Sequence, residues 1–245
     1  MKAVILVAGA SRRLRPLTED TPKCLLSVAG KPILGRMIDG LLAAGIKNFV
    51  IVTGYLEDRV RQAVDSWYPG LDAAFVTNPH YDATNTSASL LLARPFVAGQ
   101  SFLLLDGDIV GDMALGRVLL ESRFSDCLAL RPADDLGDEE VKAELDGERR
   151  VVRIGKPNVP LKVAAGESIG IEKISPAFGD PLFRALHELV EEQNGGNELR
   201  EVAYQHIIDD GATMYAVDVG DYFCTEIDTP ADLEQASREL RERGL

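Results

Sequence analysis

The stretch AVILVAGASRRLRPLTEDTPKCLLS, residues 3–27, decides the fold of this chain. It opens with an apolar run, residues 3–8, that is typical of a buried β-strand and that ends at Gly9. Arginines crowd the loop that follows, and Lys23 comes directly after a proline. Backbone N–H groups approach phosphate oxygens closely where there is no Cβ, and guanidinium groups add fixed positive charge. The segment therefore predicts a strand that leads into a polyphosphate-binding loop.

Beyond this stretch, apolar runs typical of strands alternate with helical patterns. Further strands are expected at 49–53, 73–77 and 102–105, and helices at 32–45, 57–67 and 86–94. This alternation predicts a parallel sheet with right-handed crossovers. After residue 130 the pattern predicts β segments over 140–173, helices at about 180–193 and 198–209, a strand at 213–218 and a helix at 230–243.

The predicted fold class is α/β: a Rossmann-like, mixed and mostly parallel sheet with flanking helices and a small antiparallel β extension. No linker, repeat or low-complexity tract interrupts the sequence, so one domain is expected over residues 1–245. In such a sheet, ligands bind beyond the carboxyl ends of the strands. The loop at 9–15, the loop after Thr77 and the turn at 105–108 should therefore share one rim.

Composition narrows the class of partner. The chain has 245 residues, 46% of them hydrophobic, which is ordinary for a globular protein. Its net charge of −13 argues against binding to nucleic acid. No apolar run approaches the ~18 residues that span a bilayer, and the N-terminus does not have the pattern of a signal peptide. The three cysteines are far apart and suit a reducing interior, so we expect a cytoplasmic protein without a membrane partner.

Two carboxylate pairs have the spacing of metal ligands. Asp106 and Asp108 follow an expected strand, and their i, i+2 spacing points both side chains to one side. Glu226 and Asp228 repeat the pattern before the last helix, where Asp228 or Thr229 could instead cap that helix. Two carboxylates together with phosphate oxygens are a usual way to hold Mg²⁺, which keeps several waters. Asp-Gly-Asp also occurs in plain turns, so the spacing alone leaves both interpretations open.

The segment NPHYDATNTSASL, residues 78–90, has a third pattern of interest. Asn85, Thr86 and Ser87 read as the N-cap of a helix, which is a sufficient structural explanation for them. Small residues at this position would also let a nucleobase lie against the start of the helix.

Several of these motifs together resemble one known family. Residues 9–18 (GASRRLRPLT) and 22–25 (PKCL) resemble the signature G-x-G-[ST]-R-L-x-P-L-T and P-K-x-L of the sugar-phosphate and phosphocholine-type nucleotidyltransferases. The match departs at Ser11, where the family has glycine, and at Arg12, where it has Ser or Thr. The N-x-x-Y of residues 78–81, the strand GESIG at 166–170 and the string EIDTPADL at 226–233 resemble the phosphocholine-type members.

The resemblance implies a role for particular residues. Arg13 should hold the β- and γ-phosphates and Lys23 the α-phosphate, as the catalytic cations, while Asp108 and Asp228 should bind Mg²⁺. The nucleotide-binding part is expected over about 1–130 and the acceptor-binding part over about 131–245. The expected nucleotide-binding residues are Ala8, Gly9, Ala10, Ser11, Asn78, Thr86, Ser87 and Asp106, and the expected acceptor-binding residues are Lys156, Glu167 and Glu226.

The function that the resemblance implies is Mg²⁺-dependent nucleotidyl transfer from CTP to a small phosphorylated alcohol or a phosphonate, with release of pyrophosphate. Within enzymes, a hexose-1-phosphate uridylyl- or thymidylyltransferase is the alternative. Outside them, a catalytically silent nucleotide-binding regulatory subunit stays open, because Ser11 and Arg12 depart from the signature. A dinucleotide-binding oxidoreductase fits less well, because the loop lacks G-x-G-x-x-G. The protein is expected to form a homodimer.

Overall fold

A mixed sheet forms the centre of the molecule, as seen in the computed structural model, which describes residues 1–112, 114–133 and 136–245. Its strands follow the order β10-β9-β11-β6-β1-β4-β5, and β8 and β12 join it beside β11. Four neighbouring strands run parallel to one another: β1 (Lys2–Leu6), β4 (Asn48–Thr53), β5 (Asp72–Thr77) and β6 (Phe102–Asp106). The predicted parallel part of the sheet is therefore confirmed.

The antiparallel extension continues the same sheet. β11 (Gly166–Ile174) runs antiparallel to β6 and is buried along its whole length. β8 (Cys127–Arg131) and β9 (Lys142–Leu145) pair with β11 antiparallel, β10 (Val151–Gly155) pairs antiparallel with β9, and β12 (Tyr215–Asp218) runs parallel to β8. The predicted mixed fold class is thus confirmed.

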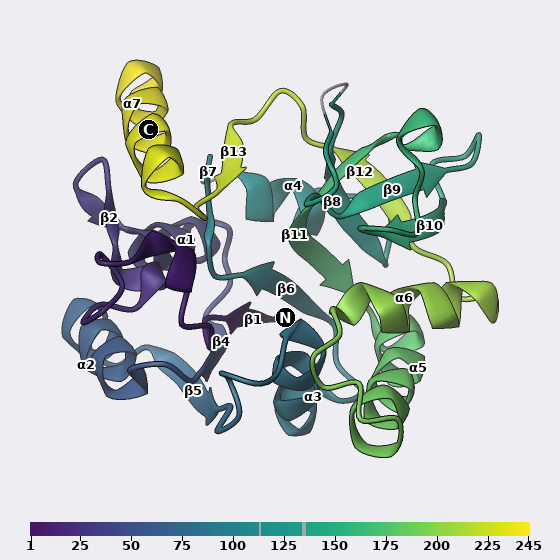
Figure 1. The fold of residues 1–245 in the computed structure, drawn as a ribbon, viewed down its shortest axis with the longest axis horizontal. Helices are drawn as coiled ribbons and strands as arrows, with labels where there is room; N and C mark the ends of the chain where they lie inside the picture. The colour runs from purple at the N-terminus through teal and green to yellow at the C-terminus, as the bar shows by residue number, and fades with distance from the viewer. Residues whose placement is uncertain (113, 134–135) are drawn as a thin grey trace.

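Helices cover both faces of the sheet (Figure 1). They are α1 (Ile33–Ala43), α2 (Glu57–Trp67), α3 (Thr86–Val97), α4 (Leu115–Glu121), α5 (Pro176–His187) and α6 (Arg200–Asp209). The last helix, α7 (Pro230–Arg243), packs instead against two short strands, Ser27–Val28 and Cys224–Glu226. Successive residues of a strand point to opposite faces, so Val4 packs in the core under α3, α5 and α6 while Ile5 packs under α1 and α2. Strands buried on both faces read as unbroken apolar runs, which is why β1 was visible in the sequence.

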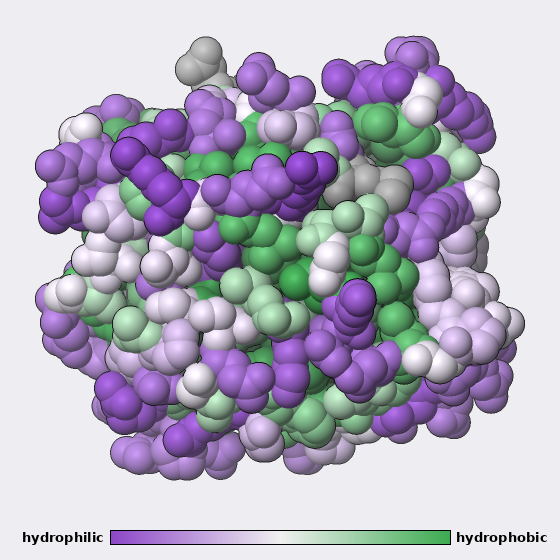
Figure 2. Space-filling model, turned by 180° about the vertical axis from the view of Figure 1, so that it is seen from behind, coloured by the Kyte–Doolittle hydropathy of each residue, from purple (hydrophilic) through white to green (hydrophobic). Residues whose placement is uncertain are grey.

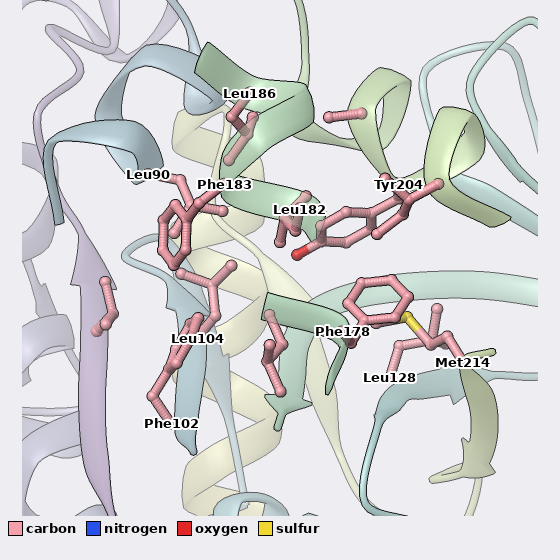
Figure 3. Packing of buried hydrophobic residues seen from close by; sticks show 14 of the residues in the cluster. Leu90, Phe102, Leu104, Leu128, Phe178, Leu182, Phe183, Leu186, Tyr204 and Met214 are labelled. Atoms are coloured by element: carbon pink, nitrogen blue, oxygen red, sulfur yellow. The ribbon is translucent and has the colours of Figure 1, made fainter. Parts of the chain in front are cut away.

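The core beneath α5 and α6 is rich in aromatic side chains (Figure 3). Phe178 of α5 meets Tyr204 of α6 edge to face, with ring centroids 5.7 Å apart. Phe102 of β6 lies against Phe183, with centroids 6.1 Å apart. This packing fixes α6 against the sheet, so the first turn of α6 is held at a defined place near the end of β6.

Several elements differ from the sequence-based expectation. α5 begins at Pro176, earlier than the predicted 180, because the Ser175 side chain caps it. Its last turn widens into a π-helical segment, Glu188–Glu192. The short strands β2 (Ser27–Val28), β3 (Lys31–Pro32), β7 (Ile109–Gly111) and β13 (Cys224–Glu226), together with α4 and β8, were not predicted. The strands of two or three residues among them carry too few apolar positions for a period to be recognised.

Within the described part of the chain, no helix is both long and apolar enough to cross a bilayer. From behind, hydrophobic residues appear near the middle of the molecule with hydrophilic residues around them (Figure 2). The expected homodimer stays a prediction.

Candidate functional site

A lysine joined to two carboxylates forms the centre of the site. Lys23 begins a short 3₁₀ turn, Lys23–Leu25, and its Nζ lies 2.9 Å from Asp108 Oδ2 and 2.9 Å from Asp228 Oδ1. Arg13 Nη2 lies 2.9 Å from the other oxygen of Asp228. The Lys23 side chain is 9% exposed and that of Arg13 is 64% exposed. One cation is therefore enclosed by the site, and the other reaches in from the surface.

The topology explains why residues so distant in sequence meet. Asp108 follows β6, and the arginine loop follows β1. Since β1 and β6 are parallel neighbours, Asp108 and this loop lie at the same edge of the sheet. β13 pairs with β7 directly after Asp108, and Ile227 N donates to the Asp108 carbonyl at 3.1 Å. This short ribbon sets Asp228 beside Asp108. Thr229 caps α7 through a capping box with Asp232, so Asp228 is left for the site.

The charges of this group stabilise one another. Burial lowers the pKa of Lys23, but the neighbouring Asp108 and Asp228 raise it more, and the net direction is upward. Partial burial raises the pKa of Asp228, but Lys23 and Arg13 outweigh it, and the net direction is downward. Both shifts favour the charged forms, so the ammonium ion and the carboxylate are present together at neutral pH.

The donor set fits a magnesium ion that shares its coordination with a substrate. Asp108 Oδ1 is buried and has no hydrogen-bond partner. No group of three or more Asp, Glu, His or Cys side chains suited to a metal occurs among the residues that the structure describes. Asp108 and Asp228 would therefore hold the ion with phosphate oxygens and water completing its coordination, as Mg²⁺ prefers. The ammonium group of Lys23 supplies positive charge between these two carboxylates.

A cavity of about 340 Å³ opens over this centre. Arg13, Asp108 and Asp228 line it, as do Asn78 and Tyr81. The remaining lining residues are Leu6, Ala8, Gly9, Thr84, Asn85, Thr86, Ser89, Asp106, Gly107, Val141, Lys156, Leu199, Arg200, Glu201 and Glu226. The predicted convergence of the loops after β1, β5 and β6 on one rim agrees with this lining.

Not all predicted nucleotide-binding residues face this cavity. Ala8, Gly9, Asn78, Thr86 and Asp106 line it, and Ser11 lines a smaller neighbouring cavity together with Lys23. Ala10 and Ser87 belong to neither lining. Ser87 is fully buried, and its hydroxyl donates to the Glu198 carbonyl at 2.6 Å, which ties the start of α3 to the loop before α6.

A second cavity of about 220 Å³ adjoins the first and shares Val141, Lys156, Glu226 and Asp228 with it. The three predicted acceptor-binding residues, Lys156, Glu167 and Glu226, all line it. Its other lining residues are Arg131, Glu139, Glu140, Val141, Thr225, Asp228 and Asp232. We call this the acidic cavity, because six carboxylates and only two basic side chains line it and no aromatic residue does.

Two carboxylates that line the acidic cavity belong to ion pairs. Arg131 Nη2 lies 2.5 Å from Glu167 Oε2, and Lys156 Nζ lies 3.6 Å from Glu139 Oε2. Glu226 opens onto both cavities, and the charged groups that act on it most strongly, Asp108, Asp106, Glu167 and Asp228, are all carboxylates. Desolvation in the site, followed by the charges of Asp108 and Asp106, raises the pKa of Glu226 to about 8. The site therefore holds an excess of negative potential where the two cavities meet.

Arg200, which the sequence analysis missed, is the other prominent cation of the site. It is the first residue of α6, is 2% exposed and lines the large cavity. Its Nη1 and Nη2 atoms donate to Asp106 Oδ1 and Oδ2 at 2.8 and 2.9 Å, and Nη2 also donates to Glu172 at 2.9 Å. No motif marks it in the sequence, because its partners come from β6 and β11.

The fold and this site together define an α/β protein of the nucleotidyltransferase type. The model of the MobA-like NTP transferase domain matches residues 3–207, and the chain belongs to that family. Family membership supports an enzyme that binds a nucleoside triphosphate and a phosphorylated substrate.

Curated relatives carry several substrate names. The chain is 31% identical over 245 residues to CMP-5'-(3-aminopropyl)phosphonate synthase of Streptomyces rubellomurinus; this covers 96% of the chain and 38% of that relative. The chain therefore spans well under half the length of that relative. It is also 31% identical over 247 residues to the UTP–glucose-1-phosphate uridylyltransferase AglF of Haloferax volcanii, covering 99% of the chain and 97% of the relative.

Solved structures agree on the fold. The inositol-1-phosphate CTP transferase of T. maritima superposes with a TM-score of 0.77 at 24% identity, covering 98% of this chain and 96% of that one. The CTP:phosphocholine cytidylyltransferase of Streptococcus pneumoniae superposes with a TM-score of 0.76 at 22% identity, covering 98% of both chains.

Proposed function

We propose that this chain is a Mg²⁺-dependent cytidylyltransferase that joins CTP to a small phosphate or phosphonate with an amino group at its other end. The observation that carries the proposal is the junction of Lys23, Asp108 and Asp228: both carboxylates line the large cavity, and Asp228 also lines the acidic cavity that adjoins it. A nucleoside triphosphate in one cavity and an acceptor in the other would bring their phosphorus groups together at this junction.

The reaction needs charge and placement more than proton transfer. An oxygen of the acceptor's phosphate forms a bond to the α-phosphorus, and the bond from that phosphorus to the bridging oxygen breaks. Pyrophosphate takes the bonding electrons. With a second pKa of about 6, the attacking phosphate is already largely ionised at neutral pH, so no general base is required. Bound Mg²⁺ would neutralise phosphate charge, and Lys23 and Arg13 add the positive charge that keeps two anions together.

The acidic cavity supports a cationic acceptor. A hexose 1-phosphate has no positive charge to offer this lining, in which six carboxyl groups outnumber two basic side chains. An ammonium group is both a counter-ion and a hydrogen-bond donor to them. A trimethylammonium group has no N–H to donate and is usually bound by aromatic faces, which this lining lacks. The lining therefore favours a primary amine over phosphocholine, in line with the aminopropylphosphonate product in the name of one relative.

CTP is proposed over UTP and dTTP on two grounds. Cytidylyl transfer is in the name of that relative and of the CTP:phosphoglutamine cytidylyltransferase of Campylobacter jejuni, which is 27% identical over 255 residues. In addition, Asn78-Pro79 stands where the hexose-1-phosphate enzymes more often carry glutamine-proline, as the sequence resemblance implies.

Pyrophosphate release tests the proposal. The purified protein is assayed with Mg²⁺ and each of CTP, UTP, dTTP, ATP and GTP against 2-aminoethylphosphonate, phosphocholine and glucose 1-phosphate. Ethylphosphonate, which lacks the amine, is the matched control acceptor. The expected result is a preference for CTP with 2-aminoethylphosphonate, and a KM at least about tenfold higher for ethylphosphonate, as the loss of one charged hydrogen bond predicts. Preference for glucose 1-phosphate with UTP or dTTP would overturn the assignment, and no release with any pair would favour a silent nucleotide-binding subunit.

A further inference from the structure

The carboxylate of Asp106 is enclosed from three directions by parts of the chain that are far apart in sequence. It belongs to the end of β6, and Arg200 reaches it from the start of α6 with a two-pronged ion pair. On its third side lies Gly170 of β11, where a Cβ would stand 2.4 Å from Asp106 Oδ2. Gly170 has a φ of +67°, within the bulged part of β11. A side chain at position 170 would displace this carboxylate.

The ion cluster around Arg200 is expensive in a folded protein. Asp106, Glu172 and Glu201 place three carboxylates around one guanidinium, and Glu172 and Arg200 are almost fully buried. Glu172 Oε2 and Glu201 Oε2 are buried without a hydrogen-bond partner. Well-packed apolar residues often give equal or greater stability than such a cluster. Stability alone therefore does not account for it, which points to a function in the cavity that Arg200 and Asp106 both line.

Orientation separates Asp106 from its neighbour Asp108. Both oxygens of Asp106 accept from Arg200, whereas Asp108 keeps one oxygen without a partner and turns the other to Lys23. A carboxylate held by a guanidinium fork is fixed in direction and neutralised in charge, so it is a poor ligand for a metal ion. Its remaining lone pairs can still accept from a bound substrate.

We propose that Arg200 is a positioning residue for the transfer reaction: it holds Asp106 out of the metal's coordination and leaves the ion to Asp108 and Asp228. This inference rests on the proposed function. Its consequence is that weakening the fork releases a third carboxylate toward the metal. Metal binding then becomes tighter while turnover becomes slower, because the ion is drawn away from the position that Asp108 and Asp228 define.

Opposite changes in these two quantities separate a positioning role from a structural one. A residue needed only for stability would lower metal affinity and turnover together. The test variant is Arg200→Lys, which keeps the charge and loses the fork. Mn²⁺ binding to the free protein is measured by electron paramagnetic resonance, and pyrophosphate release is measured with the nucleotide and acceptor that the wild type prefers. We expect Mn²⁺ to bind about tenfold tighter and kcat to fall about 10- to 100-fold, the range typical for residues that orient metal ligands.

Further variants keep the test decisive. Adding Asp106→Asn to Arg200→Lys should return Mn²⁺ affinity to the wild-type level, because the released carboxylate is gone. If Arg200→Lys does not fold, the charge-balanced pair Arg200→Gln with Glu172→Gln replaces it. Arg117→Lys, in an exposed pair with Glu121 on α4, is the matched control. Unchanged Mn²⁺ affinity, or affinity and turnover that fall together, would overturn the inference. A wild type without turnover would refute the proposed function, while the Mn²⁺ measurements would still report on Arg200.

Discussion

Lys23 and Arg200 are both cations held by carboxylates, but their surroundings give them different tasks. Lys23 bridges Asp108 and Asp228, which both line the large cavity, so phosphate oxygens or a metal ion can reach the carboxylates that hold it. Arg200 also lines that cavity, but it is 2% exposed and bound to three carboxylates. The comparison teaches that the partner carboxylates, more than the charge of the cation, distinguish the two groups, because Asp108 keeps one oxygen without a partner whereas Arg200 holds both oxygens of Asp106.

The largest expected effect comes from a substitution of Asp108, in the group around Lys23. Asp108→Asn removes one proposed metal ligand and a partner of Lys23 while keeping the side chain's shape. Turnover should fall more than about 10³-fold, beyond the loss usual for one transition-state donor. Pyrophosphate release measures the rate, and circular dichroism checks the fold. Asp65→Asn, on the exposed face of α2, is the control. Full activity of the Asp108 variant would remove this residue from the site.

Exposure should separate Lys23 from Arg13 in stability but not in rate. Lys23→Gln and Arg13→Gln should each slow turnover by roughly 10²–10³, because each removes a cation from the phosphate site. The exposed Arg13 pair should contribute at most about 1 kcal/mol to the free energy of unfolding. Lys23→Gln leaves Asp108 without its cation and Asp228 with Arg13 alone, and should cost about 1–3 kcal/mol, which added Mg²⁺ should partly restore.

Urea unfolding with and without Mg²⁺ measures this difference. Arg15→Gln is the control, because Arg15 is exposed in the same loop and lines neither cavity. Equal stability losses in the Lys23 and Arg13 variants would contradict the proposed contrast between an enclosed and an exposed cation.

The sequence predicts the group around Lys23 much better than the ion cluster around Arg200. An apolar run in the sequence predicts β1. The sequence also predicts the site residues Arg13, Lys23, Asp108 and Asp228, because each lies in a local motif. Their mutual distances agree with that prediction of one shared site. Arg200 stands at the start of a helix with no local signal, since its partners lie 94 and 28 residues away.

The role of Ser87 shows the opposite limit. Its motif suggested a nucleotide contact, but its hydroxyl donates to the carbonyl of Glu198 within the fold. A local pattern of small hydroxyl residues predicts that a helix begins, and the structure agrees that α3 starts at Thr86. Which hydroxyl then faces a cavity depends on the loop before α6, whose position no local pattern encodes.

The ion cluster around Arg200 predicts a change in the free energy of unfolding with pH. Burial, with the charge of Asp106 added and that of Arg200 opposing, raises the pKa of Glu172 from 4.5 to about 7. Glu201 and Tyr204 also face this carboxyl. A raised pKa in the folded state gives stability that is complete below pH 4.5 and is lost as pH rises toward 7. The advantage of the wild type over Glu172→Gln should therefore shrink between pH 5 and pH 8, by on the order of 1–3 kcal/mol.

Urea unfolding at the two pH values checks this, with Glu242→Gln on the exposed end of α7 as the control. Asp106 has a pKa raised to about 6 through burial, but it is present in both proteins and its own contribution largely cancels in the difference. An advantage of the wild type that grew with pH would mean that the ionised Glu172 stabilises the cluster, and the unequal charge around Arg200 would then need another explanation.

The smallest expected effect comes from Tyr204, a core residue that lies next to the ion cluster around Arg200. Tyr204 packs against Phe178 (Figure 3). Its buried hydroxyl lies near Arg200 and Glu172 and has no hydrogen-bond partner among the residues that the structure describes. Tyr204→Phe removes an unsatisfied polar group and keeps the ring, so the free energy of unfolding should stay level or rise by up to about 1 kcal/mol. Thermal unfolding measures it, and Tyr215→Phe, whose ring stacks on Phe124, is the control. A loss above about 1 kcal/mol would mean that the hydroxyl joins the Arg200 cluster through a buried water, and would extend the closed network into the core.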